Sequence, residues 1–148
     1  MDDKGFIVTS DALLSLIVVF ILLATVTNIN ADKSVSSMQD MVMAKKVQDT
    51  MELMANYKDI STNKTLIELM VEELEKNSNQ KSGIDNAGQI AGEFLNKTLI
   101  GYKYNLIEVN KLNGTTLASN ANINQAKNIS VASRSCAGYT FKLYAWNN

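Results

Sequence analysis

The most constraining feature of this sequence is an unbroken apolar stretch near its start. Residues Ala12 to Ile29 are eighteen consecutive positions without a charge, a glycine or a proline. This is about the minimum length for a helix that crosses the hydrocarbon layer of a bilayer. Twelve of the eighteen are Leu, Ile, Val or Phe, and on the membrane-insertion scale they contribute about −4 to −7 kcal/mol together. The stretch therefore predicts a membrane-spanning helix.

A single acid, Asp11, stands at the edge of this helix. An ionisable group inside a membrane segment is costly and is by default a candidate functional residue with a partner. The candidate partner is the α-amino group of Phe6, which a cut after Gly5 would create. Two opposite charges buried together cost far less than either charge alone. A pair between neighbouring chains would therefore favour side-by-side packing of identical helices in one register.

The residues around the start of this helix resemble a known signal. Lys4 and Gly5 before the cut, Phe6 after it, a nearby acid and an unbroken apolar helix resemble the class III signal peptide of type IV pilins. The Lys-Gly ending and the short leader resemble archaeal members, and the C-terminal run YTFKLYAW is similar to the tails of pilin-like proteins from methanogens. Asp11 lies one residue further from the cut than the glutamate of bacterial pilins. The glycine-rich helix start typical of archaellins is missing, which argues against a rotary filament.

This resemblance implies a domain organisation and a function. Residues 1–5 would be a leader removed by a prepilin peptidase, 6–30 a helix that serves the membrane and then the filament core, and 31–148 a helix continuation plus a globular α+β head. The chain would be a structural subunit of an archaeal type IV pilus-like filament that serves adhesion or attachment. Its partners would be copies of itself. The precursor would lie in the cell membrane with its head outside, and the filament at the cell surface.

Two other interpretations of the N-terminal stretch stay open. In one, the stretch is a plain signal anchor and Asp11 only marks the cytoplasmic edge of the helix. The chain would then be a non-polymerising, single-span surface protein whose external head binds a partner. In the other, a secretory signal is cut after Ala31, although Ile29 stands where such a signal needs a small residue and the residues before the stretch are acidic rather than basic.

The composition argues against several functional classes. The chain has 14 basic and 15 acidic residues, so it carries no electrostatic signature for nucleic acid. It has no histidine and only one cysteine, Cys136, which excludes an intrachain disulfide and an internal His/Cys zinc site. A nucleophile with a base, a metal cluster or a phosphate loop cannot be assembled from these residues. We therefore expect no enzymatic activity, no metal and no cofactor, with N-linked glycans as the candidate modification.

The helical period continues beyond the apolar stretch. Apolar residues recur at intervals of three and four, and polar residues fill the gaps, which predicts one amphipathic helix that continues the membrane segment to about Tyr57. The methionines on it are interpreted as flexible packing residues rather than metal ligands. The recurring apolar residues are Val35, Met38, Val42, Ala44, Val47, Met51 and Met54.

Two shorter helices are predicted next. Thr65 and Glu68 fit a capping box that starts the first of them. A polar loop over 77–83 separates it from the second, which we expect Asp85 to cap and Gly101 to end. The inward residues of this helix are expected to be Ala87, Ile90, Ala91, Phe94, Leu95 and Thr98, with Gly88 and Gly92 at close backbone contacts.

The last third of the chain changes to a period of two, which indicates strands. Asn113-Gly114 is the strongest short signal for a hairpin turn. We expect four strands in two consecutive hairpins, in a sheet whose apolar face is covered by the helices. The strands are expected at about 102–109, 115–118, 129–133 and 139–145, with Ile129 and Val131 alternating in the third and with Tyr144 and Trp146 at an edge or a subunit contact. The predicted class is α+β: a long N-terminal helix, two short helices and a C-terminal four-stranded antiparallel sheet, pilin-like by the resemblance.

Four asparagines stand in acceptor sequons for N-glycosylation: Asn63, Asn96, Asn113 and Asn128. All four follow the membrane segment, where an external head would meet a glycosylation machinery. The resemblance also implies glycans, because archaeal pilin-like proteins are commonly N-glycosylated. Asn113, in a tight turn, is predicted to be the best exposed, and Asn96, late in a helix, the least suitable.

Overall fold

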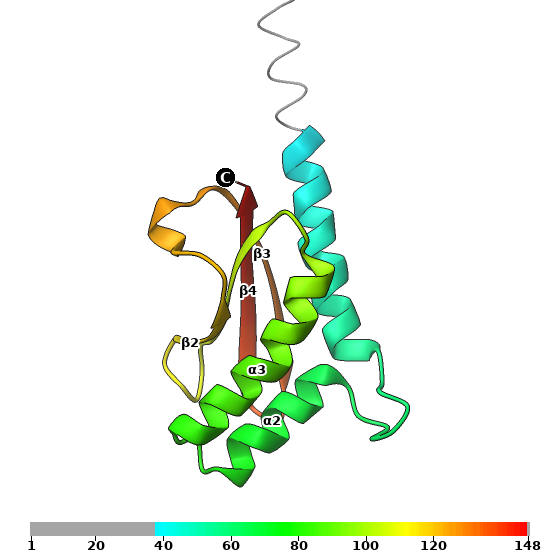
Figure 1. The fold of residues 1–148 in the computed structure, drawn as a ribbon, viewed down its shortest axis with the longest axis vertical. Helices are drawn as coiled ribbons and strands as arrows, with labels where there is room; N and C mark the ends of the chain where they lie inside the picture. The colour runs from blue at the N-terminus through cyan, green and yellow to red at the C-terminus, as the bar shows by residue number, and fades with distance from the viewer. Residues whose placement is uncertain (1–37, 148) are drawn as a thin grey trace, which may run out of the picture. The chain divides into compact units, whose positions relative to one another are not determined.

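The computed structural model describes residues 38–147. This part contains three helices and one four-stranded antiparallel sheet, which confirms the α+β class (Figure 1). The first helix covers residues 38–56. The other elements are α2 (Leu66–Lys76), α3 (Lys81–Thr98), β1 (Lys103–Glu108), β2 (Thr115–Ser119), the short 3-10 helix η1 (Ile123–Gln125), β3 (Lys127–Cys136) and β4 (Tyr139–Asn147). The predicted leader and the helix over 6–30 lie outside the described residues.

The search for membrane spans applies to the same part of the chain. Within residues 38–147, no helix combines the length and the apolar character that crossing a bilayer requires.

The sheet has the strand order β2-β1-β4-β3, and all its pairs are antiparallel. The two predicted hairpins, β1 with β2 and β3 with β4, are both present. Their inner strands, β1 and β4, pair with each other along the middle of the sheet. The connection through η1 therefore carries the chain from one edge of the sheet to the other.

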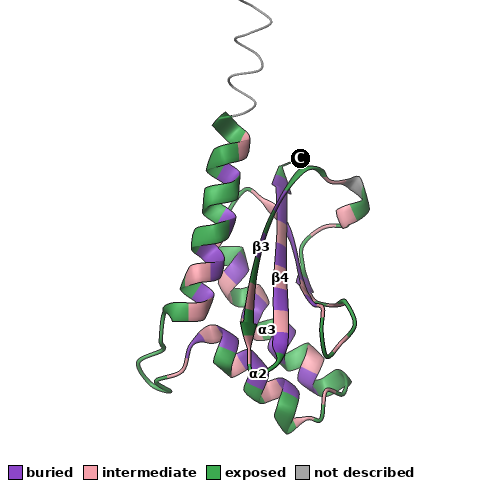
Figure 2. Ribbon diagram, turned by 180° about the vertical axis from the view of Figure 1, so that it is seen from behind, coloured by how far each residue is buried: buried purple, intermediate pink, exposed green. Residues whose placement is uncertain are grey.

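One face of this sheet forms the core with the helices. Leu106, Phe141 and Leu143 lie on that face with no exposed surface, and Met51 and Leu95 are equally buried on the helices. Figures 1 and 2, which view the molecule from opposite sides, place α2 and α3 on this one face. The burial of these side chains is the main stabilising contribution to the head, at about 1.5–3 kcal/mol for each large apolar residue.

The predicted start of α2 is confirmed in detail. Thr65 is the N-cap residue, and its hydroxyl accepts the backbone N–H of Glu68 at 3.2 Å. The Glu68 carboxylate in turn accepts the backbone N–H of Thr65 at 2.7 Å. This second bond is the main reason why the pKa of Glu68 is lowered from its ordinary value. The capping box therefore fixes the first turn of the helix from both sides.

The first turn of α3 differs from its prediction. The helix begins at Lys81 after the N-cap residue Gln80, whereas Asp85 is exposed inside the helix and does not cap it. The reason is tertiary packing. Gly83 is buried against the end of α2, where an added Cβ would come within 2.8 Å of the Glu73 carbonyl oxygen. This close contact favours a helix start that local capping signals do not reveal.

Gly88 makes the close backbone contact that the sequence predicts. A Cβ at this position would lie 2.3 Å from the carbonyl oxygen of Leu117, so α3 packs directly on the backbone of β2. The other predicted contact is looser, because a Cβ at Gly92 would meet only the Ala118 side chain, at 3.9 Å. The two glycines therefore form a matched pair for a test.

We expect Gly88→Ala to lower the free energy of unfolding by about 1–3 kcal/mol, because α3 must move away from β2 to admit the methyl group. Gly92→Ala is the control. It should leave stability unchanged or raise it by up to about 1 kcal/mol, because alanine is the better helix former. Urea unfolding of the full chain in detergent, followed by circular dichroism, measures both. Equal effects of the two substitutions would contradict the packing of α3 on β2.

The third strand is present, but the faces predicted for it are wrong. Ile129 and Val131 point away from the core and are 42% and 51% exposed, whereas Ser130 and Ala132 face the core. The register with β4 sets these faces: from Ser130 to Cys136 the pairing is regular, with Ala132 opposite the buried Leu143 and Val131 opposite Tyr144. Residues directly opposite each other in an antiparallel pair share one face of the sheet, so Val131 lies on the outer face with Tyr144. The exposed apolar residues of β3 therefore lie on the outer face of the sheet.

Trp146 is also placed differently from its prediction. It lies on the face opposite Phe141 and Leu143, as expected, but it is only 2% exposed. β4 is a central strand, so Trp146 is not an edge residue of the sheet. On one side it pairs with Lys103 of β1. Trp146 is thus buried outside the core cluster that the sheet forms with the helices, while Tyr144 on the same face is half-buried.

The helix over residues 38–56 is buried along only part of its length. Its packing residues begin at Met43 and continue with Val47, Met51 and Met54, all at most 1% exposed, as a helical stripe. The interpretation of the methionines as packing residues is confirmed for Met43, Met51 and Met54 but not for Met38 and Met41. The first turns of this helix are not packed, because Met38, Met41 and Val42 are exposed.

Candidate functional site

The candidate residues for leader cleavage and assembly, Lys4, Gly5, Phe6 and Asp11, lie outside the described residues. The described part of the chain contains the four sequon asparagines, and all four are exposed. They lie in a loop, a helix, a turn and a strand, so they form four separate sites rather than one.

The turn that carries Asn113 is held by a buried carboxylate that the sequence analysis missed. Glu108 has no exposed surface and follows Leu106 on the inner face of β1. Its two oxygens accept three backbone N–H groups, from Asn110 at 3.0 Å, Leu112 at 2.6 Å and Thr140 at 2.7 Å. The free-energy cost of burying a carboxylate is small enough only where hydrogen-bond donors such as these replace the water molecules that it loses. Glu108 therefore ties the β1–β2 connection to the start of β4.

Asn113 itself occupies the tight turn that the sequence predicts. Asn113 and Gly114 have φ values of 51° and 84°, the left-handed geometry that this pair of residues favours. The Gly114 N–H donates to the carbonyl of Glu108 at 2.8 Å, and the Thr115 hydroxyl donates to the carbonyl of Leu112 at 2.6 Å. The asparagine side chain is thus presented at the tip of an ordered, exposed turn.

Asn63 lies in the loop before α2, with a φ of 54°. The loop is organised by Asp59, whose Oδ1 accepts the backbone N–H groups of Ser61 at 2.9 Å and Thr62 at 3.0 Å. A hydrogen bond from the Ser61 hydroxyl is the largest of the causes that lower the pKa of Asp59. The hydroxyl residue of this sequon, Thr65, is the N-cap of α2.

The other two asparagines lie within regular elements. Asn96 is in the last turns of α3, and its Oδ1 accepts the hydroxyl of Tyr104 at 2.9 Å. Burial raises the pKa of Tyr104, which keeps this donor protonated. Asn128 is at the irregular start of β3. The sequence identified all four asparagines from the sequon alone and placed all but Asn128 correctly, because the third strand was expected to begin only at Ile129.

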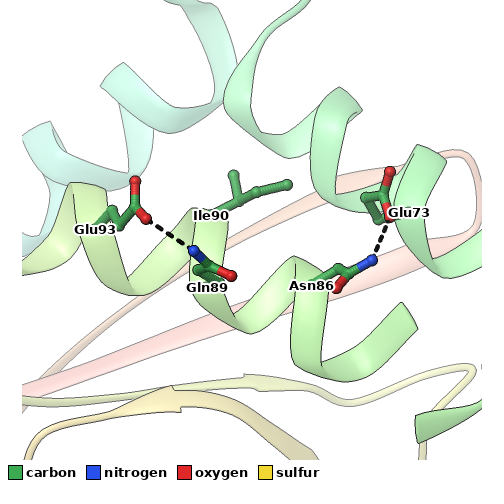
Figure 3. Close-up of a pocket in the computed structure, with 5 residues that line it drawn as sticks. All are labelled: Glu73, Asn86, Gln89, Ile90 and Glu93. Carbon is green, nitrogen blue, oxygen red and sulfur yellow. Dashed lines mark hydrogen bonds between the residues drawn. The ribbon is translucent and has the colours of Figure 1, made fainter. Parts of the chain in front are cut away.

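A polar hollow of about 370 Å³ lies between α2 and α3 (Figure 3). It is lined by Glu73, Asn86, Gln89, Ile90 and Glu93. Its carboxylates are already bonded, because Asn86 donates to Glu73 at 2.8 Å and Gln89 donates to Glu93 at 3.1 Å. These pairs stabilise the contact between the two helices and the surface of α3.

A second hollow of about 240 Å³ is mainly apolar and lies beside the end of the first helix. It is lined by Leu53, Tyr57, Asp59, Leu66, Leu69 and Phe94. Leu53 and Tyr57 at its rim are 47% and 64% exposed. The hollow has apolar walls with one carboxylate and offers no pair of groups for acid–base chemistry.

The one cysteine of the chain, Cys136, is half-buried at the end of β3. Burial is the largest of the causes that raise the pKa of its thiol, so the reactive thiolate is disfavoured. Among residues 38–147, no three cysteine or carboxylate side chains gather closely enough to hold a metal ion.

No protein-family model, no curated protein and no solved structure matches this chain.

Proposed function

We propose that this chain is a structural subunit of an archaeal type IV pilus-like filament at the cell surface. A prepilin peptidase would remove residues 1–5, and copies of the mature chain would assemble through the apolar helix over 6–30. The head would face outward and repeat along the filament. Its role would be adhesion or attachment rather than catalysis.

The observation that carries this proposal is the exposed apolar start of the first described helix. Met38, Met41 and Val42 are 64%, 65% and 56% exposed, whereas Met43, Val47, Met51 and Met54 further along the same helix are at most 1% exposed. In the sequence these residues follow the apolar stretch that ends at Ile29. Apolar side chains gathered at one end of a domain mark a contact with another molecule. A neighbouring subunit in a filament would supply that contact.

The driving force for assembly depends on the lipid environment that the helix leaves when it enters the filament. Lipid tails are as apolar as the helix, so the exchange of lipid for helix contacts yields only the energy of close packing. Pairing of Asp11 with the Phe6 amine of a neighbour would add a specific electrostatic contribution and set the register. The apolar stretch would thus be an assembly surface that stays dissolved in the membrane until it is used.

A charge at Val42 tests this use of the helix. We expect Val42→Glu to abolish filaments, because a carboxylate buried between subunits without a partner costs several kcal/mol. The stability of the head should change by less than about 0.5 kcal/mol, since Val42 is exposed within it. Electron microscopy of surface preparations and urea unfolding measure the two effects.

Gln48→Glu is the matched control, because it adds the same charge to an exposed position of the same helix. It lies on the packed half of the helix, outside the exposed apolar start, and filaments should form from it. Equal filament yields from Val42→Glu and Gln48→Glu would contradict an assembly contact at the start of this helix.

A further inference from the structure

We infer that glycans on Asn63, Asn96 and Asn128 are attached before the head folds, and that of the four sequons the folded head presents only the one at Asn113. The inference rests on the proposed location of the head outside the cell, where a glycosylation machinery acts. It goes beyond that proposal because it orders two events, modification and folding.

The chemistry requires access to two side chains in each sequon. The asparagine Nδ2 forms a bond to C1 of the sugar, the bond from C1 to the phosphate oxygen of a lipid-linked sugar breaks, the amide loses one proton, and the phosphate leaves with the bonding electrons. A serine or threonine at the third position is part of the acceptor motif. The transferase must therefore reach this hydroxyl residue as well as the amide.

In the folded head the asparagine amide and the hydroxyl residue of a sequon are not equally accessible. All four asparagines are exposed, but two of the four hydroxyl residues are buried. In the sequon of Asn63, Thr65 is only 6% exposed, and in the sequon of Asn128, Ser130 is only 9% exposed. An enzyme that approaches either asparagine would find the hydroxyl turned into the protein.

Both buried hydroxyl residues are also fixed by the fold. The Thr65 hydroxyl accepts the Glu68 N–H at 3.2 Å as the N-cap of α2, so its release would unwind the first turn of that helix. Ser130 pairs with Ala145 of β4 on the core face of the sheet. Its exposure would detach this end of β3 from the central strand.

The sequon of Asn96 is held by the helix itself. The hydroxyl of Thr98 donates to the carbonyl of Phe94 at 2.6 Å, within the last turn of α3. Leu95 and Leu99, on either side of this turn, are at most 2% exposed. An extended sequon at Asn96 would therefore require both leucines to leave the core.

Asn113 differs from Asn63 and Asn128 because its hydroxyl residue is not buried, and from Asn96 because it lies in a turn rather than in a helix. Thr115 is half-exposed, and its hydroxyl donates to the Leu112 carbonyl inside the same turn, at 2.6 Å. Gly114 between them has open space around it, because an added Cβ would meet no atom within 4 Å. An extended sequon here requires the bonds of Gly114 to Glu108 and of Thr115 to Leu112 to break, but no buried side chain of residues 113–115 has to leave the core.

Attachment of glycans before folding does not prevent the head from folding afterwards. The four asparagines are exposed, so a sugar attached to any of them would extend into solvent while Thr65 and Ser130 become buried. Early attachment is therefore compatible with the same folded head.

The test compares the same sequons in folded and unfolded chains. The acceptors are the full-length chain without glycans, in detergent micelles, the variant Phe141→Asp, and peptides with the sequences of residues 59–69 and 124–134. Phe141 has no exposed surface, so the aspartate should unfold the head, which circular dichroism verifies. Each acceptor is incubated with an oligosaccharyltransferase and a lipid-linked sugar donor, and mass spectrometry of proteolytic fragments measures the rate at each asparagine.

In the unfolded acceptors we expect rates at Asn63 and Asn128 at least about tenfold higher than in the folded chain, because closed sites react only through local opening. In Phe141→Asp the rate at Asn96 should rise likewise, while that at Asn113 should change less than about threefold. Equal rates at Asn63 and Asn128 in folded and unfolded chains would overturn the inference. It would also be overturned if folding slowed the reaction at Asn113 as much as at the other three asparagines, or if the peptides were not modified at all. The assay needs no filaments, so its failure would be distinct from a failure of the proposed assembly.

Discussion

Replacement of Asp11 with alanine is expected to abolish filament assembly while the precursor still inserts into the membrane. The carboxylate is the proposed partner of the Phe6 α-amino group in a neighbouring subunit. Without it, each subunit added to the filament would bury an unpaired positive charge. Removal of one partner from a buried ion pair costs about 3–5 kcal/mol, and this cost would recur at every subunit. Electron microscopy counts the filaments, and membrane fractionation measures insertion, which the loss of the acid should leave intact or improve.

A second substitution separates this effect from a general loss of acidic residues. Asp3→Ala removes a carboxylate from the leader, which is absent from the mature subunit if the chain is cut after Gly5. We expect this variant to form filaments in normal amounts. Normal filaments from Asp11→Ala as well would show that the charge pair is wrong.

Replacement of Glu108 with alanine is expected to lower the free energy of unfolding of the head by about 3–5 kcal/mol. Three backbone N–H groups would lose their acceptor in a site closed to water, and each unsatisfied donor costs about 1–3 kcal/mol. The lost bonds also join the β1–β2 connection to β4 through Thr140, so the turn at Asn113 should become mobile. Urea unfolding of the full chain in detergent measures the stability, and amide hydrogen exchange measures the order of the turn.

Two further variants make this prediction specific. Glu108→Gln retains one carbonyl oxygen as an acceptor and nearly the same volume, so its loss should be smaller than that of alanine. Glu93→Ala removes an exposed carboxylate bonded only to Gln89 in the described contacts, and should change stability by less than about 0.5 kcal/mol. If Glu108→Ala lowered the free energy of unfolding as little as Glu93→Ala, the Glu108 carboxylate would not organise the turn.

The parts of the fold that the sequence predicted correctly depend on local chemistry. The capping box of Thr65 and Glu68, the turn at Asn113 and Gly114, and the period-two alternation of the last third each involve residues close together in the chain. Short-range signals of this kind form the same structure in most surroundings. The class, the α2 helix and the two hairpins could therefore be predicted from the sequence.

The errors have a different physical origin. The early start of α3 depends on the packing of Gly83 against α2, and the place of Trp146 away from a sheet edge depends on the order of the strands. The faces of β3 depend on its register with β4. These features arise from contacts between distant segments, which a one-dimensional pattern does not contain.

The candidate sites show the same division. The sequon motif located the four asparagines, because the motif is itself local. The burial of Thr65 and Ser130 could not be predicted, since it depends on how α2 and β3 meet the rest of the head. Glu108 was overlooked although its alternation with Leu106 places it on the inner face. An acid at a core position is read correctly only when its hydrogen-bond donors are known.

The most direct test of the central claim is the intact mass of the mature chain in purified surface filaments. The filaments should contain this protein, with a polypeptide that begins at Phe6 after any glycans have been removed. A solitary chain that still begins at Met1 would indicate a membrane anchor, and one that begins at Asp32 would indicate a secretory signal. Either result would contradict a role for the apolar helix as the core of a polymer.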